Sequence, residues 1–421
     1  MARLLTTGFE HNSLTAGVEP GLSANAGTTS ISSTTKRSGG YALRCNPTNG
    51  SASVKFTVTA QTTGRVYHTR VYLQVTTTPN KNIAIMGFGR NSDNAGVGIA
   101  LNTDLTLTLF NLATRSAIGS NSPALATGGF YRIEVSMDWN TNAVSAYVDG
   151  VAFVNGGSAT SIEYDTIWLG VGDYSTGAVG QGSSTTNVFF DDIALNDSSG
   201  SSQTGLPGSG KIIKLKPSAA GDANTFGTQT GGTAGAGNNF TRVSENTPDN
   251  ATTFNGSSTL NQEDLFNVDD SGIGASDTVN VVHVGFRFRN STADATAGIK
   301  VEIEKTGSGT KTQSSEIKPN STTWKTNATA NPTNHPITLY KDPDGTNPWT
   351  QTTLDSMQIG YKLTTGPGTA GRRIDVSAVW AYVDYTPAST FIKTINALAK
   401  ASVKTINNLA ISSVKSKNGL T

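Results

Sequence analysis

The sequence predicts an all-β protein with two antiparallel β-sandwich domains of jelly-roll or lectin-like size, followed by a short repetitive C-terminal segment. Apolar residues alternate with polar ones over many short stretches, which is the period of half-buried strands. Charged residues make up 14% of the chain, against about 25% in ordinary soluble domains, and glycine is abundant at 46 residues. A Ser/Gly/Pro-rich stretch divides the strands into two series, and 421 residues are too many for one core.

The first series of strands lies before this stretch. Alternating apolar residues predict strands at 54–58, 71–75, 105–109, 131–137 and 144–148. The polar run "DWNTNA" between the last two has the length of a hairpin turn. The runs "TIWLGVG" and "NVFFDDIAL" predict two strands that cross a sandwich core. No amphipathic helix is predicted before residue 390.

The second series follows the Ser/Gly/Pro-rich stretch. Strands are predicted at 282–288, 299–303, 357–363 and 379–385. Lys300, Glu302 and Glu304 predict that one face of the 299–303 strand is exposed to solvent. The Gly/Thr/Ala-rich stretch 221–239 predicts a long loop. The domains are therefore 1–198 and 211–387, joined by a linker at 199–210 and followed by a tail at 388–421.

The tail repeats every eleven residues, with Lys393, Lys404 and Lys415 in register. Two structures fit: a helix whose 3.67-residue period would give a right-handed coiled coil, or short strands broken at Asn-Ala, Asn-Asn and Asn-Gly. We favour strands, because Thr, Asn, Ser and Val are mediocre helix formers. Three copies bury little alone, so we expect an attachment or oligomerisation segment that suits an acidic partner. Its apolar residues are Ile392, Ile395, Leu398, Val403, Ile406, Leu409 and Val414.

Charge and targeting signals narrow the classes of protein. The 31 basic and 30 acidic residues nearly cancel, so no nucleic-acid footprint is expected. Cys45 is the single cysteine, which excludes an internal disulfide and suits a small buried residue. We expect no signal peptide and no membrane insertion, because the N-terminus lacks an apolar stretch and no long apolar run follows. A virion protein, made in the host cytoplasm, fits this combination.

The first domain resembles the concanavalin A-like, or laminin-G-like, jelly roll. The residues that carry the resemblance are "GFYRIEVSMDWNTNAVSAYVDGVAFVNG" (129–156) and "VFFDDIAL" (188–195). The stretches "TTGFE" (6–10) and "RSGGYALRC" (37–45) look like the opening strands of such domains. This fold hosts lectins, hydrolases and adhesion modules, so the resemblance implies a fold and not one function.

The order of parts resembles tailed-phage virion proteins, in which a lectin-like domain ending in "DDI" precedes a linker and a second sandwich. The stretches at 205–217, 347–363 and 376–387 look like that second domain. The Ile-Lys-Thr-Ile-Asn pattern of the tail resembles repeats at the ends of phage and other surface-associated proteins. The resemblance implies a structural component of a tail, baseplate, fibre or capsid exterior.

A glycoside hydrolase would need two carboxylates flanking the sugar bond. Laminarinase-type hydrolases carry Glu-x-Asp-x-x-Glu on one strand. The nearest match here has Glu163 and Asp165, but Trp168 replaces the third acid. We therefore expect that Glu163 and Asp165 lie on the solvent-exposed face of a strand and that the protein has no enzymatic activity.

Metal and phosphate sites are expected to be absent. Asp191 and Asp192 could offer oxygens to calcium, but adjacent strand residues point to opposite faces, so a surface or turn role is favoured. Asp342 and Asp344 precede Gly345 in a predicted hairpin turn. "PGSGK" (207–211) lacks the phosphate-loop spacing, and the scattered histidines His11, His68, His283 and His335 do not predict zinc.

Five tryptophans could stack on sugars: Trp139, Trp168, Trp324, Trp349 and Trp380. Trp139 at a hairpin tip and Trp349 beside Pro348 are expected to be the exposed ones and are the candidate glycan contacts.

The sequence thus predicts a non-enzymatic phage virion protein that binds other virion proteins, forms homo-oligomers and touches host surface glycans. One alternative is a carbohydrate-binding or polysaccharide-degrading protein. Glycan binding with exposed Trp residues would favour a lectin, and a convergent carboxylate pair in a cleft would favour an enzyme. A bacterial surface adhesin is a third reading, against which the missing export signal counts.

Overall fold

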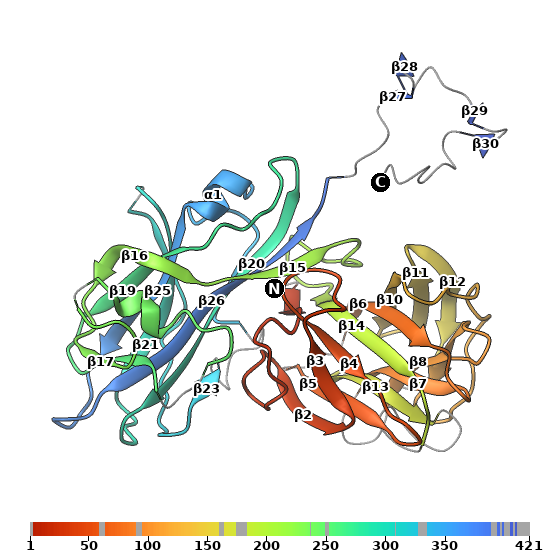
Figure 1. Cartoon of the computed structure of the whole chain (residues 1–421), viewed down its shortest axis with the longest axis horizontal. Coiled ribbons are helices and arrows are strands. Elements are labelled where there is room, and N and C mark those ends of the chain that lie inside the picture. The colour runs from red at the N-terminus through yellow and green to blue at the C-terminus, as the bar shows by residue number, and fades with distance from the viewer. Residues whose placement is uncertain are drawn as a thin grey trace.

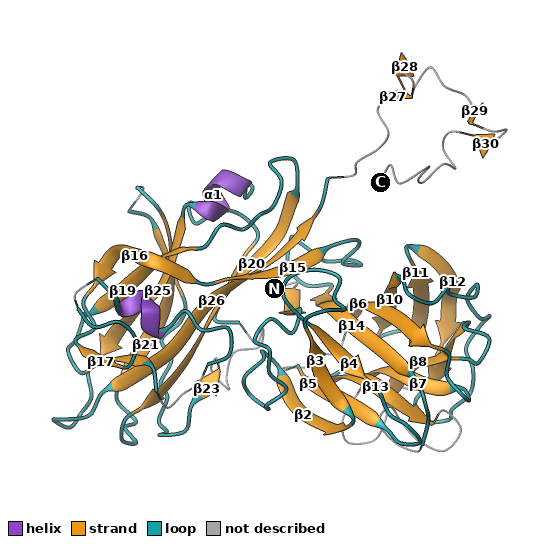
Figure 2. Cartoon of the chain, viewed as in Figure 1, coloured by secondary structure: helices purple, strands orange, loops and turns teal. Residues whose placement is uncertain are grey.

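The computed structural model describes residues 3–58, 64–89, 95–159, 164–173, 183–235, 237–248, 252–307, 309–326 and 335–388, together with four short strands between residues 394 and 410. These residues form two antiparallel β-sandwiches beside each other (Figure 1). The all-β prediction is confirmed, because helical residues within the described ranges are confined to α1 (Gln351–Asp355) and a 3-10 turn at Asn239–Arg242 (Figure 2). In this part of the chain, no helix has the length and apolar character to cross a membrane.

The first sandwich consists of two sheets, named here after their central strands. The β14 sheet has the order β12-β11-β10-β6-β14-β4-β3, and β1 pairs with the second half of β14. Its strands are β1 (Arg3–Thr7), β3 (Thr29–Ser32), β4 (Ala42–Cys45), β6 (Val66–Thr77), β10 (Phe130–Asp138), β11 (Ala143–Val148), β12 (Val151–Ser158) and β14 (Asn187–Asp197). The predicted hairpin at "DWNTNA" is the turn between β10 and β11.

The β13 sheet covers the other side of the same core, with the order β2-β5-β13-β7-β8-β9. Its strands are β2 (Leu22–Gly27), β5 (Ala52–Thr57), β7 (Ile83–Gly89), β8 (Gly96–Leu101), β9 (Leu107–Asn111) and β13 (Thr166–Asp173). Alternate apolar residues from both sheets meet between them, among them Phe56, Leu73, Val135 and Phe190, all fully or almost fully buried. Cys45 lies in this core, as predicted.

The second sandwich is built in the same way. The β26 sheet has the order β17-β18-β26-β20-β23, with β15 pairing with β26 and β24 with β20, and the β25 sheet has the order β16-β19-β25-β21-β22. Its strands are β15 (Lys211–Leu215), β16 (Pro217–Asn224), β17 (Thr228–Thr230), β18 (Phe254–Ser257), β19 (Glu263–Val268), β20 (Thr278–Asn290), β21 (Gly298–Lys305), β22 (Lys311–Gln313), β23 (Lys325–Thr326), β24 (Ile337–Leu339), β25 (Met357–Thr365) and β26 (Ile374–Thr386).

The long β26 has a different neighbour on each face. Val379, Ala381 and Val383 point into the second core, as their alternation predicted. Trp380 and Tyr382 point the other way, toward the first sandwich, where the ring of His11 lies 4.3 Å from that of Trp380. The strand is therefore buried on both faces over this half, and it joins the two sandwiches.

Two expectations about the second sandwich are wrong. The stretch 221–239 is not one loop, because β16 continues to Asn224 and β17 follows at Thr228–Thr230. Residues with small side chains can still form strands, because strands pair through backbone hydrogen bonds. The prediction that one face of β21 is exposed to solvent is also wrong, because Glu302 and Glu304 are buried. Lys311 on the neighbouring β22 lies over them and forms ion pairs with Glu304 and Glu263.

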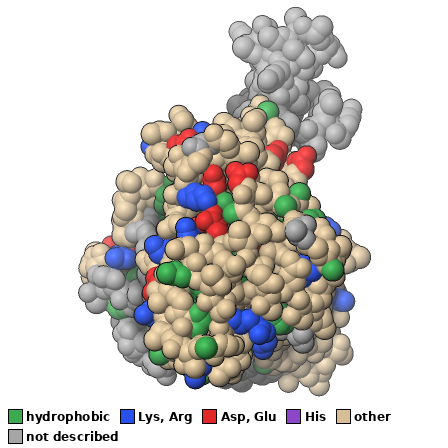
Figure 3. All heavy atoms as spheres, turned by 90° about the vertical axis from the view of Figure 1, so that its left-hand side faces the viewer, with side chains coloured by type: hydrophobic (Ala, Val, Ile, Leu, Met, Phe, Trp, Pro, Cys, Tyr) green, Lys and Arg blue, Asp and Glu red, His purple; other side chains and the backbone are tan. Residues whose placement is uncertain are grey.

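The end of the second sandwich that faces away from the first carries few charges. Uncharged polar side chains and backbone atoms dominate this end, and acidic and basic side chains lie next to one another in its upper half (Figure 3). The surface thus reflects the low charged fraction of the sequence.

The described part of the tail contains short strands, the reading favoured from the sequence. β27 (Thr394–Ile395) pairs with β28 (Leu398–Ala399), and eleven residues later β29 (Thr405–Ile406) pairs with β30 (Leu409–Ala410). Ile395 faces Leu398 and Ile406 faces Leu409 in register. The expected assembly residues Ile392, Val403 and Val414 lie outside the described residues.

Candidate functional site

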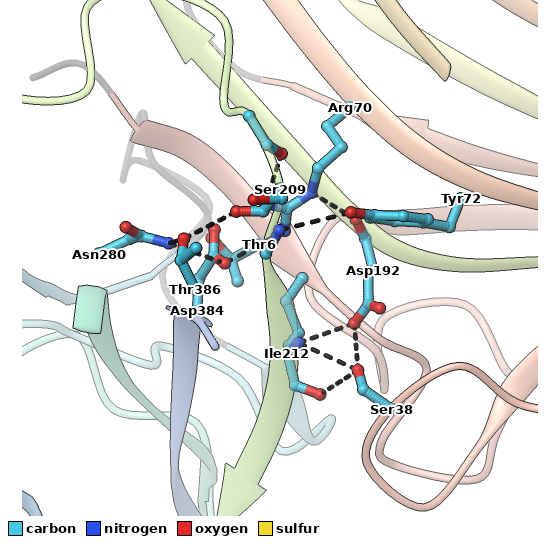
Figure 4. A network of polar contacts seen from close by, with 12 residues as sticks. Thr6, Ser38, Arg70, Tyr72, Asp192, Ser209, Ile212, Asn280, Asp384 and Thr386 are labelled. Atoms are coloured by element: carbon cyan, nitrogen blue, oxygen red, sulfur yellow. Dashed lines mark hydrogen bonds and ion pairs between the residues drawn. The ribbon is translucent and has the colours of Figure 1, made fainter. Parts of the chain in front are cut away.

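The two sandwiches are locked together by a buried ionic network. Asp384 at the end of β26 forms ion pairs with Arg3 on β1 at 2.5 Å and with Arg70 on β6 at 3.2 Å, and all three side chains are fully buried. Burial alone would raise the pKa of Asp384, but the two guanidinium groups outweigh it and lower that pKa. The carboxylate therefore stays ionised between its partners. Figure 4 shows Asp384 together with Arg70 in the network between the sandwiches.

A second group of contacts starts at a bulge in β14. Asp192 has a left-handed backbone with φ of 50°, and its Oδ1 accepts hydrogen bonds from the Ile212 backbone N–H at 2.7 Å and the Ser38 hydroxyl at 2.5 Å (Figure 4). Its Oδ2 pairs with Arg37 at 2.6 Å. Through these contacts Asp192 fixes β15 of the second sandwich against the 37–38 loop of the first.

The stretch 199–210, predicted as a linker, contributes to the same junction. Its Gly208 N–H donates to Glu134 at 2.7 Å, and its Ser209 carbonyl accepts from Thr386 at 2.7 Å. The chain between the sandwiches is thus held by both of them.

Beside this junction, Glu10 sits in a glycine-lined cradle. The Gly40 N–H donates to its Oε2 at 2.7 Å. Gly39 has a φ of 56°, and a Cβ there would lie 2.1 Å from Oε1, while one on Gly8 would lie 3.2 Å from it. Only glycine at residue 39 therefore allows this backbone and leaves room for the carboxyl group.

The Glu10 carboxyl group is protonated at neutral pH. Burial raises its pKa to about 8, and the neighbouring Glu19 and Asp192 add to the rise, whereas the hydrogen bond from Gly40 opposes it. Its Oε1 has no hydrogen-bond partner among the described residues. Glu10 thus offers a proton and a lone pair that the surrounding protein does not use.

Lys214 on β15 lies close to this carboxyl group. Its Nζ is 2.9 Å from the Asn246 carbonyl, 3.2 Å from the Glu245 carbonyl and 3.0 Å from Nδ1 of His11. Burial lowers the pKa of Lys214 to about 7, against the attraction of Glu19 and Glu10. Burial also lowers the pKa of His11 well below its usual value, so His11 is neutral.

Glu10 and Lys214 border a cleft of about 510 Å³ between the sandwiches. The first sandwich supplies one wall and the second supplies the other. The cleft is lined by Glu10, Ser33, Lys36, Gly39, Gly40, Tyr41, Ile213, Lys214, Leu215, Lys216, Asn246, Asp269, Asp270 and Ser271. Hydrogen-bond donors, acceptors and one aromatic ring thus converge on a volume typical of small-ligand sites.

The cleft can bind a polar ligand, and it also holds a carboxyl group on each wall. Burial raises the pKa of Asp269, and the Lys216 N–H donates to its Oδ1 at 2.8 Å. The sequence did not point to this site, because Glu10 and Lys214 lie far apart in the chain and neither belongs to a motif. The one available signal was the short Gly-Gly pair at 39–40, which marks a tight backbone position.

The two tryptophans predicted to be exposed lie elsewhere. The expectation is wrong for Trp349, which is 4% exposed and packs in the second core. Thr350 caps α1 directly after it, so the chain turns back and Leu354 enters the same core. Trp139 is half-buried against the first core, and its ring centroid lies 6.4 Å from that of Tyr67.

The acidic candidates have structural partners. Asp191 and Asp192 do not point to opposite faces as predicted, because the bulge turns both toward Arg37 and Ser38. Asp342 and Asp344 both pair with Lys305 in the predicted turn at Gly345.

The laminarinase-like acids do not assemble a site within the described residues. Asp165 accepts a hydrogen bond from the Thr166 hydroxyl at 2.6 Å, and Glu163 lies outside those residues. Trp168 packs beside Phe110 on the outer face of the β13 sheet. In the part of the chain that the structure describes, no three His, Cys, Asp or Glu side chains cluster as a metal site would require.

No family model and no curated protein sequence matches the chain. Among solved structures it is similar to the cellulose induced protein Cip1, with 17% identity and a TM-score of 0.37 over 49% of this chain and 99% of that one. A Trypanosoma rangeli sialidase matches at 17% identity and a TM-score of 0.30, over 40% of this chain and 26% of that one.

A structure of botulinum neurotoxin type C, titled for its dependence on two ganglioside molecules, matches at 11% identity and a TM-score of 0.34, over 46% of this chain and 47% of that one. The chain thus spans less than half of the sialidase and neurotoxin chains. Likeness at this level extends to part of the β-sandwich architecture and says nothing about function.

Proposed function

We propose that this chain is a non-enzymatic glycan-binding protein and that the cleft between its sandwiches holds the saccharide. The observation that carries the proposal is the buried, protonated carboxyl group of Glu10, which borders the cleft with an unpartnered Oε1. A neutral acid can donate to or accept from a sugar hydroxyl without the cost of burying a charge.

The rest of the lining supports a polyhydroxylated ligand. Lys36, Lys216 and Asn246 carry donors, Asp269 and Asp270 carry acceptors, and Tyr41 supplies a ring. The volume of about 510 Å³ fits one or two sugar rings. Both walls must hold their spacing for such a ligand, and the buried Asp384 network provides that rigidity.

Glycan-array screening followed by calorimetric titration tests the proposal, with Glu10→Gln as the variant. The amide can still accept from Gly40, but its NH₂ group lacks the lone pair that the protonated carboxyl group offers to a sugar hydroxyl. We expect binding to weaken by roughly tenfold or more, because one lost hydrogen bond in a desolvated site costs about 1–3 kcal/mol. Asp104→Asn, at an exposed acid that is not part of the cleft lining, is the control and should bind as the wild type does.

Glycoside hydrolysis is the second candidate, favoured by the carboxyl groups on both walls. Glu10 would act as the general acid and Asp269 or Asp270 as its partner. Release of reducing ends from the glycan that binds would establish the enzyme, provided that Glu10→Gln abolishes it. Binding without release supports the non-enzymatic proposal, and no binding to any glycan contradicts both.

We further propose that the protein is displayed on a phage particle through its tail. The two hairpins that recur at an interval of eleven residues support a repeating docking segment. Light scattering of the full chain and of a chain ending at Pro387 tests self-assembly. We expect an oligomer for the full chain and a monomer for the shortened one. Equal masses would contradict assembly through the tail.

A further inference from the structure

The outer face of the β26 sheet is divided at a register shift. Between the pairs Arg287↔Ala378 and Phe288↔Val376, one strand gains a residue at Ser377. On one side of the shift, Trp380 and Tyr382 are covered by the first sandwich. On the other side, the same face carries Arg289 and Arg373, which we call the arginine pair. Phe254, Trp324 and Asp375 contact these two side chains.

Asp375 holds the two arginines at a fixed spacing. Its Oδ2 accepts from Nε of Arg289 at 3.2 Å, and its Oδ1 accepts from Nε of Arg373 at 2.6 Å. The Asp375 side chain is fully buried, whereas those of Arg289 and Arg373 are 28% and 31% exposed. Their Nη groups make no hydrogen bond to the described residues.

Aromatic rings and a glycine fix the planes of the guanidinium groups. The Arg289 Cζ lies 4.5 Å from the Trp324 ring centroid and 5.5 Å from that of Phe254, and the Arg373 Cζ lies 5.6 Å from Phe254. Gly256 faces Asp375 across the strands, and a Cβ there would lie 2.9 Å from Nε of Arg373. The glycine therefore leaves the space that Arg373 occupies.

The charge of the arginine pair selects its ligand. Two guanidinium groups and one carboxylate sum to +1 (2 − 1), which complements a monoanion. Forked Nη donors match the two oxygens of a carboxylate, and restrained side chains lose little entropy when they bind. The half-buried Trp324 adds a ring beside these donors.

We propose that Arg289 and Arg373 bind the carboxylate of an acidic saccharide, such as a uronic acid residue, at a site separate from the cleft. Glu10 and the other cleft residues take no part in it.

Oligomers of galacturonic acid and their fully methyl-esterified counterparts are the probes, because they share the sugar backbone and the ester replaces each charged carboxylate with a neutral group. Calorimetry of the full chain should show binding of the acid and at least roughly tenfold weaker binding of the ester. Arg289→Gln and Arg373→Gln should each weaken binding of the acid to about the level of the ester. Arg372→Gln is the matched control, since Arg372 pairs with Asp294 instead.

Three results would overturn the proposal: no binding of the acid, equal binding of acid and ester, or unchanged binding in both arginine variants. Inorganic sulfate that binds as tightly as the oligomer would show a general oxyanion site and no saccharide site. Circular dichroism of each variant verifies folding, and a variant that fails to fold is replaced by Arg→Lys at the same residue. Arg289→Gln and Arg373→Gln should leave binding of the ester unchanged, because neither residue lines the cleft, and this separates the site from the proposed function.

Discussion

The burial of single ionisable residues decides how this protein responds to pH. The pKa of Glu10 is raised to about 8 by burial, with Glu19 and Asp192 adding to the rise and Lys214 facing it from β15. Between the unfolded pKa near 4.5 and the folded pKa, the folded state binds a proton that the unfolded state has lost. Glu10 therefore lowers the free energy of unfolding as the pH rises through this window.

At the residue scale, we predict that Glu10→Gln makes the free energy of unfolding fall less steeply between about pH 5 and pH 8. The wild type should lose up to about 4 kcal/mol more than the variant, at roughly 1.4 kcal/mol for each unit of pKa shift. Urea denaturation at both pH values measures the difference. Glu316→Gln should keep the wild-type slope, because hydrogen bonds from Thr365 and Thr364 lower the pKa of Glu316 below this window. Equal slopes for wild type and Glu10→Gln would refute the prediction.

At the scale of elements, alternation predicted the strands well and their surroundings less well. The inward residues of β5, β10 and β26 follow from a period of two residues. The bulge at Asp192 breaks that period, so both carboxylates of its pair face one loop, contrary to the prediction. The predicted exposure of Trp349 and Glu302 was wrong, because a sequence pattern shows which residues share a face of a strand but not what covers that face. The cleft could not be predicted, because its walls come from separate sandwiches.

The pairing of β20 with β26 gives the prediction at this scale. Gly285 faces Trp380, and a Cβ on Gly285 would lie 2.7 Å from an indole carbon. The indole is fully buried against His11 and cannot move aside. We expect Gly285→Ala to lower the free energy of unfolding by about 1–3 kcal/mol, the usual cost of overpacking.

Thermal and urea unfolding measure this effect, with Gly205→Ala as the control. Gly205 has no atom within 4 Å of the position that a Cβ would take, so this change should cost little. A Gly285→Ala protein as stable as Gly205→Ala would mean that the indole is free to move.

At the scale of the whole molecule, Asp384 joins the sandwiches because it forms ion pairs with two buried guanidinium groups. We predict that Asp384→Asn removes the carboxylate that pairs with both Arg3 and Arg70 and lowers stability by about 3–5 kcal/mol. Because the contacts between the sandwiches are weakened more than either core, calorimetry should show the single unfolding transition of the wild type divided into two. Asp149→Asn, at an exposed turn, is the control. A single transition in Asp384→Asn would show that the apolar contacts of Trp380 suffice.

The course of β26 has a mechanical consequence. The tail leaves the body of the protein directly after this strand, so a tensile force on the tail acts along the strand axis. β15 and β20 flank its last residues on both sides, with hydrogen bonds perpendicular to that axis. Such a force shears all these bonds together and does not open them one by one, and the buried Asp384 passes it on to the first sandwich. A load applied through the tail would therefore meet the combined resistance of these hydrogen bonds before β26 separates from its sheet.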